Sequence, residues 1–232
     1  MEGCHMTIID GDTLKEAYKN AADIDDREKE TAYKMIDQQI EENKRLKGIL
    51  DALARKSDWQ IRRAVAEQGY GLDQLINDPE PAVRAKVAEQ GYGLEKLVTD
   101  AHPMVREAVA MKNYGLEKLV ADPYAYVRIA VARQRYGLEK LVNDPDVDVR
   151  LTVAKQGYGL DQLINDPDSA VRAEVAEQGY GLDYLINDSD AYVRIAVARQ
   201  RYGLEKLVAD PVWMVRIAVA RQRYGLEKLV ND

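Results

Sequence analysis

The sequence is dominated by an internal repeat with a period of 22 residues. Eight units follow one another without insertion or deletion, beginning at residues 56, 78, 100, 122, 144, 166, 188 and 210. A Val-Arg or Ile-Arg pair fills the sixth and seventh positions of every unit, from Ile61-Arg62 to Val215-Arg216. Regular repeats of this kind indicate a solenoid, in which each unit packs mainly against the units beside it.

Each unit is predicted to form two helices. In residues 78–99, Asp78 is a candidate N-cap and Pro79 occupies the first helical position, where its missing N–H costs nothing. Gly91 and Gly93 separate this helix from a shorter second one. The apolar residues at helical spacing are Val83, Val87 and Ala88, then Leu94, Leu97 and Val98. Because so short a second helix is not stable alone, neighbouring units must bury it.

This unit resembles two related families. The run Asp-Pro, three variable residues, Val-Arg, two residues and Val-Ala resembles the first helix of HEAT-like repeats. The short unit with a brief second helix is similar to the leucine-rich repeat variant family. The resemblance covers residues 56–231 and implies an all-α, right-handed α-solenoid of eight two-helix repeats. One branch of the variant family carries an iron–sulfur cluster on a cysteine-rich N-terminal segment. Only Cys4 is present here, so no cofactor is expected.

The first 55 residues do not repeat, and we expect residues 1–55 to cap the array of residues 56–232. A short helix ending at Ala22 and a longer one from Asp25 to Lys47 are predicted. Leu50 and Leu53 then match the leucines of the second helix of the next unit and suggest a half-repeat. A polar helical cap would cover the apolar edge of the first unit.

Composition indicates a folded protein outside membranes. Apolar residues make up 46% and charged residues 31%, with a formal net charge of −7. The apolar runs are shorter than the ~18 residues that a membrane span needs. No signal peptide is recognisable, and the single cysteine, Cys4, cannot form a disulfide within the chain. A cytoplasmic, reducing compartment is therefore expected.

The repeated arginines have two interpretations. Every unit carries Arg at position seven, and an Asp opens every unit but the first. The arginines could form a phosphate-binding row. We favour an Asp–Arg ladder that joins successive units, because it explains both residues.

Positions five, eight and twelve share one face of the first helix and vary between units. Position eight holds Arg63 in one unit and Glu107 in another, so it is predicted to contact solvent even where it holds isoleucine. The alternative is that these isoleucines fill a groove between helices. Exposed Trp, Tyr, Met and Arg are typical of protein interfaces. The predicted partner-binding residues are Trp59, Met104, Met111, Tyr126, Ile129, Arg133, Leu151, Tyr192, Ile195, Arg199, Trp213, Met214, Ile217 and Arg221.

A non-enzymatic scaffold that binds a protein partner is the favoured function. Nucleic-acid binding is the alternative, through the arginine pairs 133/135, 199/201 and 221/223. The acidic fifth and sixth units lie between these pairs, which disfavours a continuous basic groove. Catalysis is a distant third hypothesis. The three serines occupy predicted turns, and His5 and His102 lack further ligands nearby, so neither a serine triad nor a metal site is expected.

The last unit suggests one further partner. Val215, Val219, Leu226 and Leu229 are expected to face a following unit that this sequence does not contain. Exposed apolar surface of this kind costs roughly 25 cal/mol per Å². The sequence therefore predicts a homodimer through the C-terminal end, and a two-fold pairing would be closed.

Overall fold

The computed structural model describes residues 26–225 and 227, and all regular secondary structure in these residues is helical. The N-terminal helix is α2 (Asp26–Leu53). Eight nine-residue helices follow: α3 (Trp59–Glu67), α5 (Pro81–Glu89), α7 (Pro103–Met111), α9 (Ala125–Arg133), α11 (Val147–Lys155), α13 (Ser169–Glu177), α15 (Ala191–Arg199) and α17 (Trp213–Arg221). Between them lie the four-residue helices α4 (Leu72–Leu75), α6 (Leu94–Leu97), α8 (Leu116–Leu119), α10 (Leu138–Leu141), α12 (Leu160–Leu163), α14 (Leu182–Leu185) and α16 (Leu204–Leu207). The second helix of the last unit and the short helix predicted to end at Ala22 lie outside the described residues.

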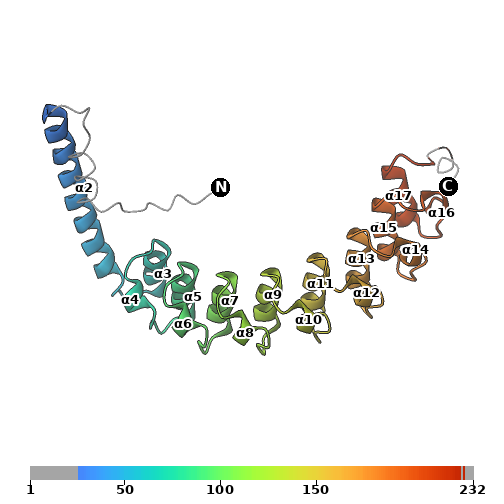
Figure 1. Cartoon of the computed structure of the whole chain (residues 1–232), viewed down its shortest axis with the longest axis horizontal. Helices are drawn as coiled ribbons and strands as arrows, with labels where there is room; N and C mark the ends of the chain where they lie inside the picture. The colour runs from blue at the N-terminus through green and yellow to red at the C-terminus, as the bar shows by residue number, and fades with distance from the viewer. Residues whose placement is uncertain (1–25, 226, 228–232) are drawn as a thin grey trace.

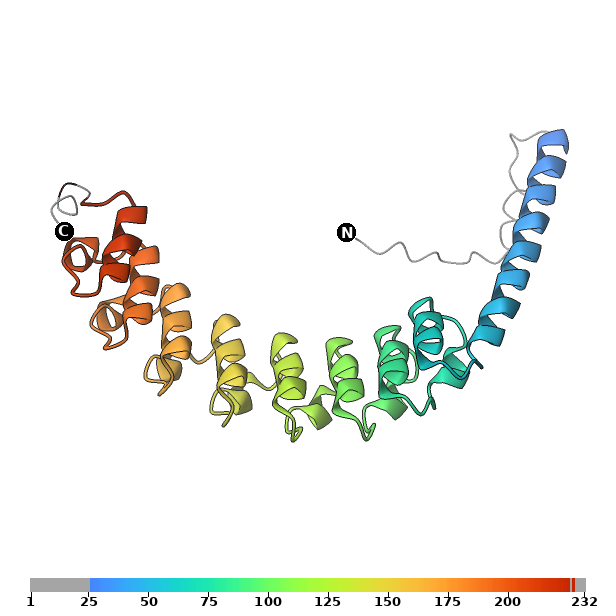
Figure 2. The same ribbon diagram turned by 180° about the vertical axis from the view of Figure 1, so that it is seen from behind.

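The units form one curved array (Figure 1). The nine-residue helices stand side by side along the inside of the arc, and the four-residue helices lie toward its outside, as the reverse view also shows (Figure 2). Each nine-residue helix contacts the next one along the chain. This arrangement confirms the all-α solenoid, while its right-handedness stays a prediction.

The core follows most of the positions that do not vary between units, although the invariant tyrosine at position fifteen is exposed in most units, as Tyr92 is at 43%. Val83 and Val87 are completely buried in the second unit, and Leu97 of the short helix is 1% exposed. Ala88 is also completely buried, as are its counterparts in the first seven units. A methyl group at this position lets adjacent helices approach closely, and the invariant alanine is explained in this way.

The first helix of each unit begins two residues later than predicted. Helix α5 starts at Pro81, with Glu80 as N-cap, and Pro79 lies in the preceding turn. Asp78 does not cap the helix, because its carboxylate accepts hydrogen bonds from Arg62 and from the backbone N–H of Glu80. Where the third position is aspartate, this residue supplies the cap instead, as Asp168 does for the N–H of Ala170 at 2.8 Å.

Helix α2 is longer than predicted and covers less of the array. Leu50 and Leu53 belong to this one continuous helix, and they pack against the core beside Ala54. Further from the array, Met35 and Leu46 are exposed (66% and 42%). Only the C-terminal end of α2 therefore covers the first unit, and the rest projects beyond it (Figure 1).

None of the helices in residues 26–225 is long and apolar enough to cross a membrane.

Candidate functional site

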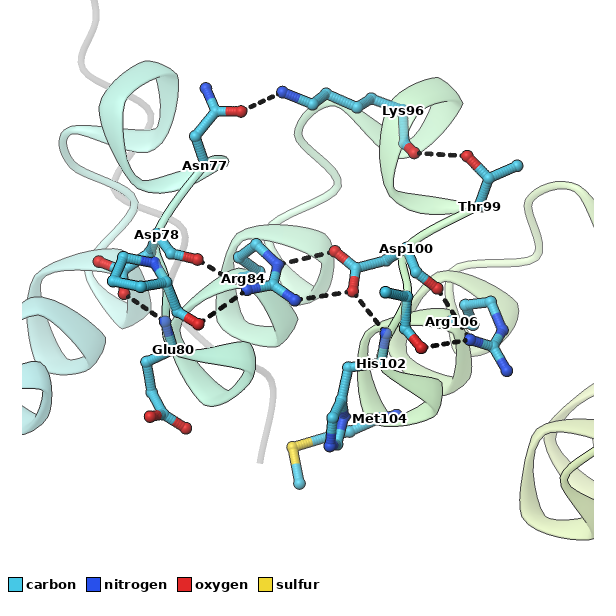
Figure 3. A network of polar contacts seen from close by, with 12 residues as sticks. Asn77, Asp78, Glu80, Arg84, Lys96, Thr99, Asp100, His102, Met104 and Arg106 are labelled. Carbon is cyan, nitrogen blue, oxygen red and sulfur yellow. Dashed lines mark hydrogen bonds and ion pairs between the residues drawn. The ribbon is translucent and has the colours of Figure 1, made fainter.

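The repeated arginines lie between successive units and are bound on all sides. The guanidinium of Arg84 donates from Nε and Nη2 to the two carboxylate oxygens of Asp100, at 2.7 and 2.8 Å (Figure 3). Its Nη1 donates to the carbonyl oxygens of Asp78 and Pro79. The same Asp100 carboxylate also accepts from the backbone N–H of His102. One arginine thus ties its own turn to the first turn of the next unit.

This contact recurs with a constant separation of 16 residues. The seven pairs are Arg62–Asp78, Arg84–Asp100, Arg106–Asp122, Arg128–Asp144, Arg150–Asp166, Arg172–Asp188 and Arg194–Asp210. The predicted Asp–Arg ladder is confirmed. The alternative of a phosphate-binding row is wrong for these seven arginines, because neighbouring carboxylates already occupy their guanidinium groups.

The predicted partner-binding residues lie on the faces of the nine-residue helices with three degrees of exposure. The exposed ones are Trp59, Met104, Met111, Tyr126, Arg133, Tyr192, Arg199, Trp213, Ile217 and Arg221. Ile129, Leu151 and Met214 are half-buried. Ile195 is buried, and its prediction as a surface residue is wrong.

Ile195 is only 9% exposed and belongs to α15, which packs against α17 of the next unit. It lines a groove between α15 and α17 together with Trp213, Met214 and Ile217 of the last unit. The alternative interpretation, that an isoleucine at position eight fills a groove between helices, is therefore correct for Ile195. Ile217, one unit further on, is 40% exposed.

A second groove lies over α5 and α7 at corresponding repeat positions, and it is chemically different. Its apolar wall includes Met104 and Met111, while Lys86, Glu89 and Glu107 give it charges of both signs. Positions five, eight and twelve therefore line hollows at two places along the array. The intervening fifth and sixth units hold small or charged residues at many of these positions, so the apolar surface is divided into two patches.

Tyr124 is a further exposed aromatic residue, and the sequence analysis missed it. It is 48% exposed, and its ring centroid lies 5.8 Å from that of Tyr126. The Arg106 guanidinium carbon lies 5.8 Å from the Tyr124 centroid, a cation–π distance. The sequence did contain a signal for its exposure. Position three holds histidine or acidic residues in several other units, so a tyrosine at this position is expected to contact solvent.

The arginine pairs of the alternative hypothesis are exposed, but they are not equivalent to one another. Arg199 forms an ion pair with Glu177 of the preceding unit at 2.9 Å. Arg135, Arg201 and Arg223 adopt positive φ angles of 58–59°, a backbone conformation that residues other than glycine rarely adopt. Glu177 belongs to the acidic sixth unit, which separates the pair at Arg133 and Arg135 from the two C-terminal pairs.

The C-terminal end differs from the prediction in part. Val215 and Val219 are completely buried within the chain itself, so they offer no apolar surface to a second copy. Leu226 and Leu229 lie outside the described residues. The argument for a homodimer through this end thus loses two of its four residues.

Within the part of the chain that the structure describes, no group of three or more His, Cys, Asp or Glu residues could hold a metal ion. No protein-family model matches the chain, and no curated protein or solved structure is similar to it. The resemblance to HEAT-like and leucine-rich repeat variant proteins accordingly stays a prediction.

Proposed function

We propose that this chain is a non-enzymatic cytoplasmic scaffold that binds a protein partner through the variable face of its nine-residue helices. One observation carries the proposal. Large apolar side chains remain exposed at positions five, eight and twelve, with Tyr192 at 65% and Met104 at 44%. Trp213, at position four, is 60% exposed beside them.

The residue types and their grouping support protein binding. Scattered exposed apolar residues are normal on any soluble protein. Here Met104 and Met111 line one groove, and Trp213 and Ile217 line another, and clustered apolar surface of this kind marks interaction sites. Trp, Tyr and Arg are also the residues that most often dominate interface energies.

Nucleic-acid binding through the arginine pairs has less support. The ladder arginines are already bound to aspartates, and Glu177 pairs with Arg199. We expect no tight binding of a single-stranded oligonucleotide at physiological salt. Tight binding that weakens steeply as salt rises would favour the alternative.

Affinity capture from the source cells tests the proposal with three proteins. The first is the native chain. The second is a stripe variant with Met104→Ser, Tyr126→Ser, Trp213→Ser and Met214→Ser. The third is a control variant with Glu95→Gln, Glu117→Gln, Glu139→Gln and Glu205→Gln, which are exposed residues of the four-residue helices.

A partner on the variable face should be captured by the native chain and the control variant and lost from the stripe variant. Circular dichroism of each variant checks that folding is unchanged. Capture of no partner, or retention of the partner by the stripe variant, would contradict the proposal.

A second prediction concerns the C-terminal homodimer. Light scattering over a concentration series should show association if Leu226 and Leu229 make such a contact. A strict monomer at high concentration would rule it out.

A further inference from the structure

The groove between α15 and α17, two helices at the red end of Figure 1, has a largely apolar wall. Its volume is about 370 Å³. Ile195 forms its floor at 9% exposure, whereas Trp213 and Ile217 in its wall stay 60% and 40% exposed. Met214 completes the apolar lining. Water therefore contacts aromatic and aliphatic surface that a ligand side chain could cover, which is favourable by roughly 25 cal/mol per Å².

The charged residues of this groove are all positive. Arg199 and Arg221 both occupy position twelve, and no carboxylate lines the groove. At the corresponding place over α5 and α7, Lys86 is accompanied by Glu89 and Glu107. The two grooves lie at corresponding positions of the same repeat. Their difference in charge therefore comes from their side chains and not from the backbone.

The two arginines differ in how much of their charge is already compensated. Arg199 is bound to Glu177 of the preceding unit at 2.9 Å. Arg221 follows Arg199 in the same row, and among the described residues no carboxylate pairs with it. The outer side of the groove thus presents an uncompensated guanidinium next to exposed apolar surface. Arg201 and Arg223, in the turns that follow α15 and α17, add to the positive charge of this end.

We propose that this groove binds an acidic amphipathic segment of a partner protein. Its apolar side chains lie against Ile195, Met214 and Ile217, and its carboxylates pair with Arg221 and Arg199. Planar guanidinium groups suit carboxylates well, because two parallel hydrogen bonds can form. The inference rests on the proposed function and narrows it to one place and one kind of partner.

A nucleic acid would use this site poorly. Affinity for phosphate backbones grows with the number of basic contacts, and two arginines in the groove are few. The apolar wall would stay uncovered by phosphates. An apolar segment without acidic residues would in turn leave the arginines unpaired, so both features together favour the acidic amphipathic occupant.

Synthetic peptides provide the direct test. The first is a peptide of roughly 15 residues, long enough to form a helix on the surface, with Leu at helical spacing and Glu elsewhere. The second has Lys in place of every Glu, and the third has Ser in place of every Leu. Fluorescence of Trp213 in a Trp59→Tyr background reports binding, because the chain has two tryptophans.

The first peptide should bind, and the other two should bind at least tenfold more weakly. Arg221→Ser and Ile217→Ser should each weaken binding of the first peptide about tenfold, which corresponds to one strong contact of about 1.4 kcal/mol. Glu177→Gln should tighten binding, because it releases Arg199. Glu95→Gln is the control, since Glu95 is an exposed residue of α6 that lines neither groove, and it should change nothing.

Several results would overturn the inference. These are equal binding of the Lys and Glu peptides, no binding of the Glu peptide, or equal losses from Glu95→Gln and Ile217→Ser. Binding of an oligonucleotide that needs Arg221 but not Ile217 would also overturn it, as would association of the chain with itself through this groove. If the captured partner needs the stripe residues but tolerates Arg221→Ser, the scaffold function stands and this inference fails.

Discussion

Each ladder arginine makes a bidentate ion pair and additional hydrogen bonds to carbonyl oxygens. Its removal therefore leaves a carboxylate and the carbonyl oxygens without their hydrogen-bond donor. Arg150 donates to both oxygens of Asp166, at 2.7 and 2.9 Å, and to the carbonyl oxygens of Asp144 and Pro145. The Asp166 side chain is only 3% exposed. Arg150→Met leaves this carboxylate buried without its guanidinium, and the loss should be about 3–5 kcal/mol in the free energy of unfolding.

Denaturant unfolding measures this loss, and the double variant Arg150→Met/Asp166→Leu is its control. The double variant should lose less than the two single changes together, because no charge is left unpaired. Strict additivity of the two changes would show that the side chains are not energetically coupled.

The ladder aspartates also predict a dependence on pH. Burial raises the pKa of Asp188, but hydrogen bonds from Arg172 and from the backbone N–H of Asp190 outweigh it and hold this pKa below its usual value. The same balance lowers the pKa of Asp100 and Asp210. A carboxyl whose pKa is lowered by folding stabilises the folded state above its unfolded pKa. That stability is lost as the pH falls through the folded pKa.

The free energy of unfolding should therefore be nearly constant from pH 7 to 5 and fall below about pH 4. Denaturant unfolding at a series of pH values measures it. Asp188→Asn removes one titrating group, so this variant should lose less stability between pH 5 and pH 3 than the native chain does. An equal loss in both proteins would contradict the assignment.

Comparison of the eight units correctly separated most core residues from surface residues. Val131 occupies an invariant position and is completely buried, whereas Tyr192 occupies a variable one and is 65% exposed. Ile195 shows where this reasoning ends. Its position holds charged residues in other units, but here it lines a groove together with Trp213 and Met214 of the next unit. A contact between units cannot be read from a single repeat position.

At the scale of elements, two glycines of one unit explain why one repeat position varies and another does not. Gly157 and Gly159 both have positive φ angles, of 71° and 62°. A Cβ atom at Gly159 would lie 2.6 Å from Cγ2 of Val142, whereas a Cβ atom at Gly157 would meet no heavy atom within 4 Å. Arg135 stands at the Gly157 position in the preceding unit, while the Gly159 position is glycine in every unit.

Gly157→Ala should therefore cost only the strain of the left-handed backbone, about 1–2 kcal/mol. Gly159→Ala adds a clash with the core and should cost about 1–3 kcal/mol more. Thermal and denaturant unfolding of the two variants make the comparison. Equal losses would mean that the close approach to Val142 relaxes at no cost.

The boundaries of the elements were predictable only approximately. Pro79 looked like the first residue of a helix, because Asp-Pro is a common start. The carboxylate of Asp78 is instead bound by Arg62, which lies 16 residues earlier, and the helix begins at Pro81. The contact between Arg62 and Asp78, 16 residues apart, thus affects where the helix begins. The sequence likewise suggested a half-repeat at Leu50 and Leu53, but both residues extend α2. Gly48 lies two residues before Leu50 and stays helical, whereas Gly71 adopts a positive φ of 59° directly before Leu72.

At the scale of the whole molecule, the constant period predicts that one unit can be removed without changing the rest. Removal of residues 144–165 joins Asn143 to Asp166, and Asp166 then stands 16 residues after Arg128, as Asp144 does now. Because each unit contacts mainly its neighbours, stability is approximately a sum over units and interfaces. The shorter chain should keep its helical content per residue and a cooperative melt, with a lower melting temperature.

Removal of residues 155–165 instead deletes half a unit, and it places Glu177 16 residues after Arg150 where Asp166 should be. This variant should melt without cooperativity or remain partly unfolded, because α12 and one ladder contact are lost together. Circular dichroism and scanning calorimetry distinguish the two outcomes, and similar behaviour of both deletions would show that the register of the repeat does not control the fold.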